Sequence, residues 1–232
     1  MSEKLFTPFK MGALELGNRT VMAPMTRCRA TDNIPNALMA KYYAQRATAG
    51  LIVTEGTAPS ANGLGYARIP GLYNQDHVAG WKLVTDAVHE AGGRIFVQLM
   101  HVGRVGHELN LPEGAELVAP SAIANDGEMY TDQEGPQPHS EPRAMTEDDV
   151  EQAIEEYVSS AKLAMEAGFD GIELHGANGY LIDQFLNTAT NQRDDRWGGS
   201  VANRARFALE VARRTADAIG ASKVGIRLSP YG

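Results

Sequence analysis

Three side chains able to form hydrogen bonds lie close together in the stretch GIELHGANGYLIDQFL, residues 171–186. The stretch begins as an apolar strand and ends as a helical pattern, with His175, Asn178 and Tyr180 at the junction. His175 and Asn178 can both donate to one carbonyl or nitro oxygen and polarise it as electron density arrives. Because a phenol is protonated at neutral pH, Tyr180 can give a proton to a carbanion-like carbon.

Two glycines in the same stretch let the backbone turn tightly between the strand and the helix. Gly176 and Gly179 flank the polar residues, so the three side chains can converge over one end of the strand. Any one of the three taken alone could equally be a satisfied core histidine or a packing residue. Their combination beside two glycines favours a functional site.

The elements that must position these residues alternate along the chain. Apolar runs of strand length occupy residues 21–24, 51–55, 94–99, 171–175 and 224–229. Helical patterns lie between them, at residues 36–50, at 77–93, after a capping box at Thr146 and Asp149, and after a cap at Ser200. Strands that alternate with helices imply a parallel sheet, which is either an open doubly wound sheet or a barrel.

The residues on the two faces of the strands favour the barrel. One face is aliphatic, as a face packed beneath helices requires, and comprises Ile95, Val97, Leu99, Ile172, Leu174, Val224, Ile226 and Leu228. The other face carries Gln98, His175 and Arg227 near the carboxyl ends of the strands, where barrel enzymes place their active sites. No G-x-G-x-x-G motif follows the first strand, which disfavours an open dinucleotide-binding sheet. We therefore predict an α/β fold, a (β/α)8 TIM barrel of which this chain carries about the first five β/α units in one domain over residues 1–232.

The composition of the chain indicates which class of molecule it binds. The 232 residues carry a formal net charge of -8, which argues against a nucleic-acid or anionic-membrane surface and favours a small-molecule substrate. The single cysteine, Cys28, allows no internal disulfide, which suits a reducing compartment. The first ten residues lack the apolar core of a signal peptide, and no apolar run approaches membrane-spanning length. We expect a cytoplasmic protein.

Seven motifs, in order along the chain, resemble the Old Yellow Enzyme family of FMN-dependent ene-reductases, of the bacterial alkene, N-ethylmaleimide or nitrate-ester reductase type. They are LFTPFKMGALELGNRTVMAPMTRCRA, GLIVTEGT, GYARIPGLY, QLMHVGR, ELHGANGYLIDQFL, NQRDDRWGGSVANRARFALEV and GIRLSP. Their order and spacing cover essentially the whole chain, so the resemblance is far more specific than a lone motif. It implies a TIM barrel that binds FMN and uses NADPH or NADH as its hydride donor.

The resemblance also implies which residues contact the flavin. The matched positions lie at the ends of several strands and are Pro24, Met25, Thr26, Gly56, Gln98, His175 and Arg227. A fixed guanidinium at Arg227 makes physical sense, because a reduced flavin carries negative charge. The FMN phosphate of the family is held by the last strands and their loops, and this part of the pattern is absent from the chain.

The catalytic and substrate positions follow in the same way. His175 and Asn178 match the pair that holds the activating oxygen of the substrate, and Tyr180 matches the proton donor. Tyr66 and Met100 match positions over the substrate pocket, and Met100 stands where many relatives have a tryptophan. The implied reaction reduces activated C=C bonds of enones, maleimides and nitroalkenes, with nitro compounds and nitrate esters as further candidate substrates.

Other interpretations can be weighed against this one. A Schiff-base barrel enzyme is disfavoured because no lysine ends any of the five strands. His101, His107 and His139 lie in a long aperiodic stretch, residues 101–145, that we expect to cover the substrate; no His-x-His or cysteine pair makes them a metal site. A closed barrel needs eight strands, so a truncated or split-barrel fragment that is active only with a complementary C-terminal piece remains an open alternative.

Overall fold

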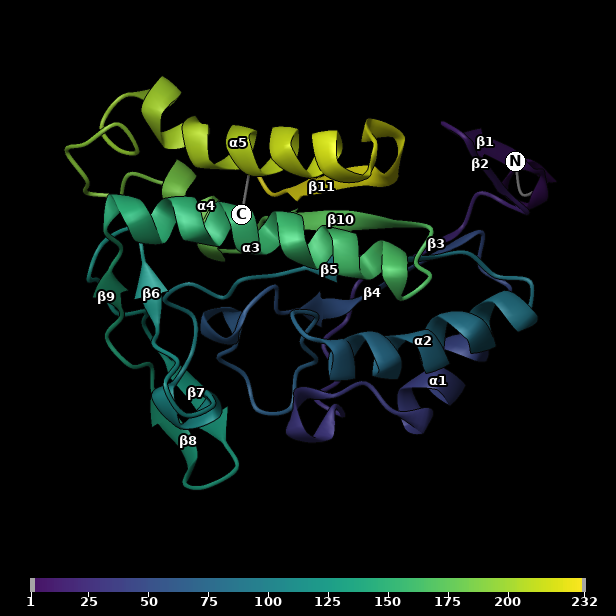
Figure 1. Cartoon of the computed structure of the whole chain (residues 1–232), viewed down its shortest axis with the longest axis horizontal. Coiled ribbons are helices and arrows are strands. Elements are labelled where there is room, and N and C mark those ends of the chain that lie inside the picture. Colours follow the sequence, from purple (N-terminus) through teal and green to yellow (C-terminus); the bar gives the residue numbers. More distant parts are fainter. Residues whose placement is uncertain (1–2, 231–232) are drawn as a thin grey trace.

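A five-stranded parallel sheet forms the centre of the molecule in the computed structural model, which describes residues 3–230 (Figure 1). In spatial order the strands are β11 (Val224–Leu228), β10 (Gly171–Gly176), β5 (Ile95–Leu99), β4 (Leu51–Thr57) and β3 (Val21–Met22). The five apolar runs predicted as strands all form this sheet. Each strand after β3 pairs with the sheet strand that precedes it in the chain, so the spatial order of the strands follows their order in the sequence without reversing. A doubly wound sheet reverses at a switch point, so the order is typical of a barrel wall.

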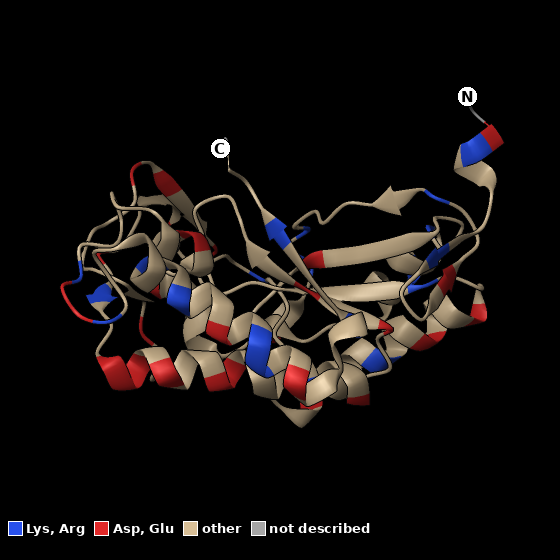
Figure 2. Cartoon of the chain, turned by 90° about the horizontal axis from the view of Figure 1, so that it is seen from above, with Lys and Arg blue, Asp and Glu red and all other residues tan. Residues whose placement is uncertain are grey.

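Four long helices connect the strands and lie along one side of the sheet (Figure 2). They are α1 (Ala37–Ala44), α2 (Gln75–Glu90), α3 (Glu147–Glu166) and α5 (Val201–Ile219), and the shorter α4 (Leu181–Leu186) follows β10. The predicted caps are confirmed: Thr146 and Asp149 form a capping box on α3, and the Ser200 side chain accepts from the Asn203 backbone N–H at the start of α5. The helix predicted over residues 36–50 ends early at Ala44, because the chain continues in tighter turns with bonds between residues three apart.

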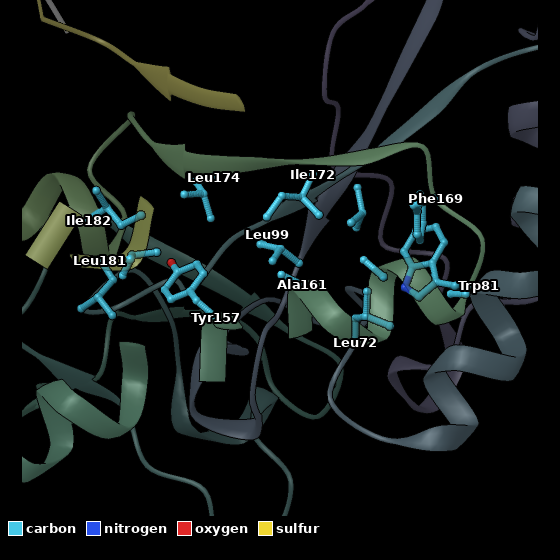
Figure 3. Packing of buried hydrophobic residues seen from close by; sticks show 14 of the residues in the cluster. Leu72, Trp81, Leu99, Tyr157, Ala161, Phe169, Ile172, Leu174, Leu181 and Ile182 are labelled. Atoms are coloured by element: carbon cyan, nitrogen blue, oxygen red, sulfur yellow. The ribbon is translucent and has the colours of Figure 1, made fainter. Parts of the chain in front are cut away.

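The hydrophobic core lies between this side of the sheet and the helices. Figure 3 shows Ile172 and Leu174 pointing from β10 towards Tyr157 and Ala161 of α3, and all four side chains are fully buried. The predicted aliphatic face is therefore confirmed for β10, and the residues of β5 join the same core. On β11 the prediction is wrong for Ile226 and Leu228, which are 43% and 57% exposed, because β11 is the edge strand and only its first residue packs against this core.

The remaining elements are short and lie outside the sheet. β1 (Phe9–Met11) and β2 (Leu14–Leu16) form a hairpin, and the long stretch after β5 contains β6 (Val118–Ala119), β7 (Glu128–Thr131), β8 (Gly135–Pro138) and β9 (Arg143–Ala144). Single 3-10 turns are η1 (Glu3–Phe6), η2 (Thr31–Asn33), η3 (Ala61–Gly63), η4 (Glu108–Asn110) and η5 (Ala221–Lys223). The stretch predicted as an aperiodic loop is thus ordered: β7 pairs with β8 and β6 with β9. None of the helices in residues 3–230 is long and apolar enough to cross a membrane.

Candidate active site

One cavity of about 120 Å³ lies at the carboxyl ends of the strands. The residues that line it are Pro24, Met25, Thr26, Gln98, Met100, His175, Asn178, Tyr180 and Arg227. Every one of them was predicted from the sequence as a flavin, substrate or catalytic position. The segment after β3 and the strand β11 are at opposite edges of the sheet, yet both contribute to this cavity. The sheet therefore curls, as the wall of a barrel must.

His175, near the end of β10, contributes a neutral imidazole to the cavity. The side chain is 4% exposed, and its Nδ1 atom has no hydrogen-bond partner among the described residues. Burial, with a smaller contribution from the Arg227 charge, lowers the pKa of His175 to about 4. At neutral pH the ring is therefore uncharged, with one N–H donor and one acceptor nitrogen.

Asn178 and Tyr180 reach the cavity because the backbone between the strand and α4 turns through the left-handed region. Asn178 has φ 59° and Gly179 has φ 81°, and asparagine and glycine tolerate this conformation best. The backbone N–H of Asn178 donates to Ser229 Oγ over 3.0 Å. Tyr180 is the N-cap of α4, and its ring packs edge-on against the His175 ring with 4.8 Å between centroids. The structure thus brings these three side chains to one cavity, as the sequence predicts.

A buried glutamine that sequence reasoning missed holds this turn in place. Gln184 is 1% exposed, and its Nε2 donates to the backbone carbonyls of Val102 and Gly179 over 2.9 and 2.7 Å. Its Oε1 accepts from the backbone N–H of Arg104 over 3.2 Å. The one side chain thus ties the loop after β5 to the loop after β10. A glutamine directly before the apolar pair Phe185 and Leu186, on a helix whose other residues are mostly apolar, was the signal that could have identified it.

Tyr66 does not line the cavity but contacts a residue that does. Its hydroxyl oxygen lies 3.0 Å from the Tyr180 hydroxyl oxygen, and either can donate. Burial, followed by the neighbouring Tyr180, raises the pKa of Tyr66 far above the ordinary phenol value. Tyr66 therefore stays protonated throughout the working pH range and extends the polar site away from the cavity.

Gly56 also lies outside the cavity lining, directly behind Met100. A Cβ atom at this position would come within 2.5 Å of Met100 Sδ. The glycine therefore allows Met100, which is 1% exposed, to pack against β4 and present its side chain to the cavity. The structure places Gly56 as a support for Met100.

Below the cavity, three polar side chains from adjacent strands contact one another. Gln98 Nε2 donates to Glu173 Oε1 over 2.7 Å, and Arg227 Nε donates to the same oxygen over 3.2 Å. Sequence reasoning identified Gln98 and Arg227 but not Glu173. Its position on the polar face of β10, two residues before His175, was the available signal.

The three histidines weighed as a metal site are held separately by the backbone. His101 Nδ1 accepts from the Gly103 N–H and His107 Nδ1 from the Leu109 N–H, whereas His139 Nδ1 lies 3.2 Å from the Gly106 carbonyl oxygen. Within residues 3–230, no group of three or more His, Cys, Asp or Glu side chains is placed to hold a metal ion.

Comparisons with known proteins agree on one family. The family model described as the NADH:flavin oxidoreductase / NADH oxidase family matches residues 4–232. Chanoclavine-I aldehyde reductase of Penicillium roqueforti is 49% identical over 98% of this chain and 60% of its own length. A probable flavin mononucleotide-dependent alkene reductase of Leishmania infantum is 46% identical over 97% of this chain and 63% of its own.

Solved structures give the same result. A morphinone reductase variant in complex with tetrahydroNAD superposes with a TM-score of 0.95 at 48% identity, over 98% of this chain and 64% of that one. The old yellow enzyme homologue from Zymomonas mobilis has a TM-score of 0.95 at 44% identity, over 99% and 64% of the two chains. The chain therefore spans between 60% and 64% of the length of these four relatives.

Proposed function

The chain belongs to the NADH:flavin oxidoreductase / NADH oxidase family, and we propose that it is an FMN-dependent ene-reductase that reduces activated C=C bonds with hydride from NADPH or NADH. The resemblance to the Old Yellow Enzyme family and the predicted TIM-barrel fold class are both confirmed. The observation that supports the proposed activity is that every residue lining the cavity at the carboxyl ends of the strands is a predicted flavin, substrate or catalytic position.

The chemistry of the cavity fits an isoalloxazine ring, a flat heterocycle rich in carbonyl oxygens and ring nitrogens. The Arg227 guanidinium and the Thr26 hydroxyl can donate to such oxygens, and Nδ1 of the buried His175 has no hydrogen-bond partner within residues 3–230. Pro24 and Met25 supply apolar surface against a ring face. When bound, FMN supplies the hydride that it takes from the nicotinamide cofactor. We propose that these residues, with Gln98, hold the ring.

The chain's own groups would bind and polarise the substrate. His175 and Asn178 hold the activating oxygen by hydrogen bonds, and the low pKa of His175, about 4, makes it a neutral donor at working pH. Tyr180 gives its hydroxyl proton to the α-carbon, so its O–H bond breaks as a C–H bond forms. Its position between His175 and Tyr66 fixes the hydroxyl at the cavity wall.

Substrates with a carbonyl or nitro group beside the double bond fit this arrangement. Relatives are named as reductases of chanoclavine-I aldehyde and of 12-oxophytodienoate, and a similar structure is morphinone reductase; each of these names includes a carbonyl compound. Met100, an adaptable side chain at the cavity wall, favours substrates of varied shape. We also propose a cytoplasmic location, supported by the single cysteine, which suits a reducing compartment.

A flavin titration followed by turnover tests this proposal. The purified chain is titrated with FMN, and binding is followed by the visible absorbance and by quenching of flavin fluorescence. The flavin-loaded protein is then reduced anaerobically with NADPH or NADH and mixed with a cyclic enone, a maleimide or a nitroalkene. Reoxidation of the flavin with formation of the saturated product supports the function. Reduced flavin that reacts with oxygen but with none of the three acceptors contradicts it.

A second candidate, that the chain works only with a complementary segment, rests on the edges of the sheet. β3 and β11 are the edge strands, and Val21 and Leu228 on them are 55% and 57% exposed. Proteins normally pair or cover the edge strands of a sheet, because an exposed apolar edge can pair with another chain. We propose that a C-terminal segment equivalent to the part of the relatives that this chain does not match pairs with both edges. After free FMN is removed by gel filtration, the chain alone would then retain no yellow flavin, and it would retain flavin only when the corresponding segment of a relative is added.

A further inference from the structure

We propose that Glu173 is a positioning residue of the flavin site, whose carboxylate orients the Gln98 carboxamide and anchors the Arg227 guanidinium. This inference rests on the proposed function, since it concerns how the same cavity holds a flavin ring. Glu173 does not itself line the cavity, so it acts through its two neighbours.

The sheet register places the three residues side by side. Glu173 lies on β10 directly opposite Gln98 of β5, and Arg227 lies on β11 on the other side of β10. Gln98 Nε2 and Arg227 Nε both donate to Glu173 Oε1, over 2.7 and 3.2 Å. One carboxylate oxygen therefore connects three neighbouring strands beneath the cavity.

The contact decides which end of the Gln98 amide is available to a ligand. A carboxylate oxygen can only accept, so the group of Gln98 that faces Glu173 must be the NH₂. The Gln98 carbonyl oxygen is then left for the cavity that Gln98 lines. It can accept a hydrogen bond from a ligand N–H, and the pyrimidine ring of a flavin carries an imide N–H. Without Glu173 the amide could present either end.

The same contact sets the net charge beside the ring. The Arg227 and Glu173 side chains are 39% and 17% exposed, so both charges are partly shielded from water. A cation beside the ring favours the negatively charged reduced flavin, and the carboxylate offsets part of that preference. Glu173 thus holds Arg227 in place while limiting how far its charge raises the reduction potential.

Two variants separate the effect of Glu173 on the orientation of Gln98 from the effect of its negative charge. Glu173→Gln keeps the size and one acceptor oxygen but removes the charge, whereas Glu173→Leu removes both. Glu55→Gln is the matched control, because Glu55 is a buried carboxylate of β4 in the same sheet, held by the Tyr43 hydroxyl and the Arg27 backbone N–H, and it does not line this cavity.

The first measurement needs no flavin. In side-chain ¹H–¹⁵N spectra of the chain, we expect the Gln98 NH₂ and Arg227 Nε–H signals to be shifted from the random-coil positions and slow to exchange. In Glu173→Leu both should exchange at least about tenfold faster, and in Glu55→Gln both should remain as in the parent. Unchanged Gln98 and Arg227 signals in Glu173→Leu would overturn the proposal whether or not the chain binds FMN. If Glu173→Leu does not fold, the same comparison is made with Glu173→Ala, which also removes both acceptor oxygens.

The second measurement uses the flavin-loaded protein. Glu173→Gln should raise the reduction potential of bound FMN, and Glu173→Leu should weaken FMN binding about tenfold, while Glu55→Gln changes neither. A potential that is unchanged or lower in Glu173→Gln would refute the charge role. Failure of the parent chain to bind FMN, with the spectra behaving as expected, would instead count against the proposed function and leave the positioning role supported.

Discussion

The hydroxyl oxygens of Tyr66 and Tyr180 lie 3.0 Å apart although the two residues are separated by 114 positions in the chain. Tyr66 keeps its proton because burial raises its pKa. In the proposed reaction Tyr66 would therefore donate to the Tyr180 oxygen as Tyr180 gives up its proton at the cavity, and this hydrogen bond would stabilise the resulting tyrosinate.

Replacing Tyr180 by phenylalanine should slow alkene reduction by about 10²- to 10⁴-fold, because the proton donor to carbon is lost. Reduction of the flavin by the nicotinamide needs no proton from Tyr180 and should keep its rate. Stopped-flow absorbance of the two half-reactions measures both effects separately. Tyr66→Phe, which removes only the supporting hydrogen bond, should slow alkene reduction about tenfold. Equal slowing of both half-reactions in Tyr180→Phe would show that the hydroxyl serves the structure of the site instead.

Asn178 offers a pair of variants that separate chemistry from backbone strain. Both Asn178→Ala and Asn178→Gly remove the carboxamide, so both should raise the barrier to alkene reduction by about 2.7 to 4 kcal/mol if it acts like an oxyanion-hole donor. Only alanine is strained at φ 59°, at a cost of about 1 to 2 kcal/mol of folding stability. Urea unfolding and single-turnover rates are the two measurements. An Asn178→Gly variant with the parent's rate would exclude the carboxamide from the reaction.

Local sequence signals predicted the five sheet strands and the caps at Thr146 and Ser200, because strand alternation and capping depend on residues close together in the chain. Local patterns also pointed to His175, Asn178 and Tyr180, whereas the cavity residues that follow β3 came from motif resemblance, since the segment after β3 and the strand β11 meet only when the sheet curls. Glu173 and Gln184 were missed because their partners lie far away in sequence: Gln98 is 75 positions from Glu173, and Val102 is 82 from Gln184. Tertiary hydrogen bonds of this kind leave no periodic pattern.

Gln184→Leu should destabilise the fold strongly while keeping nearly the same side-chain volume. The variant leaves the carbonyls of Val102 and Gly179 and the N–H of Arg104 without their partner. Each buried group left unsatisfied costs about 1 to 3 kcal/mol, so we expect a loss of at least about 3 kcal/mol in urea unfolding.

The control for this change is Gln152→Leu on α3, because Gln152 is exposed and, among residues 3–230, its side chain bonds only to the half-buried Glu156. That variant should differ from the parent by less than about 0.5 kcal/mol. A Gln184→Leu protein as stable as Gln152→Leu would mean that water replaces all three lost bonds.

Acid should weaken the fold through three buried histidines. Burial lowers the pKa of His77 and His175 to about 4 and that of His101 to about 3. An unfolded histidine has a pKa of about 6.5, so between pH 6.5 and 4 the unfolded chain binds protons that the folded chain does not. Stability is therefore complete above pH 6.5 and falls as the pH drops, by up to about 1.4 kcal/mol per pH unit for each histidine.

Urea unfolding at pH 7, 6 and 5 measures how the free energy of unfolding depends on pH. The salt-bridged Asp149 does not interfere, because Arg143 lowers its pKa to about 2 and the stability it contributes is lost only at lower pH. His77→Asn is the matched variant, since an asparagine oxygen can replace Nδ1 as the acceptor for the Tyr73 N–H. The slope of its free energy of unfolding against pH should be smaller than that of the parent, by up to about 1.4 kcal/mol per pH unit, because one fewer histidine takes up a proton on unfolding. The same stability at pH 7 and pH 5 in the parent would mean that these histidines take up protons in the folded state as easily as in the unfolded one, and the neutral donor role of His175 would then fail with it.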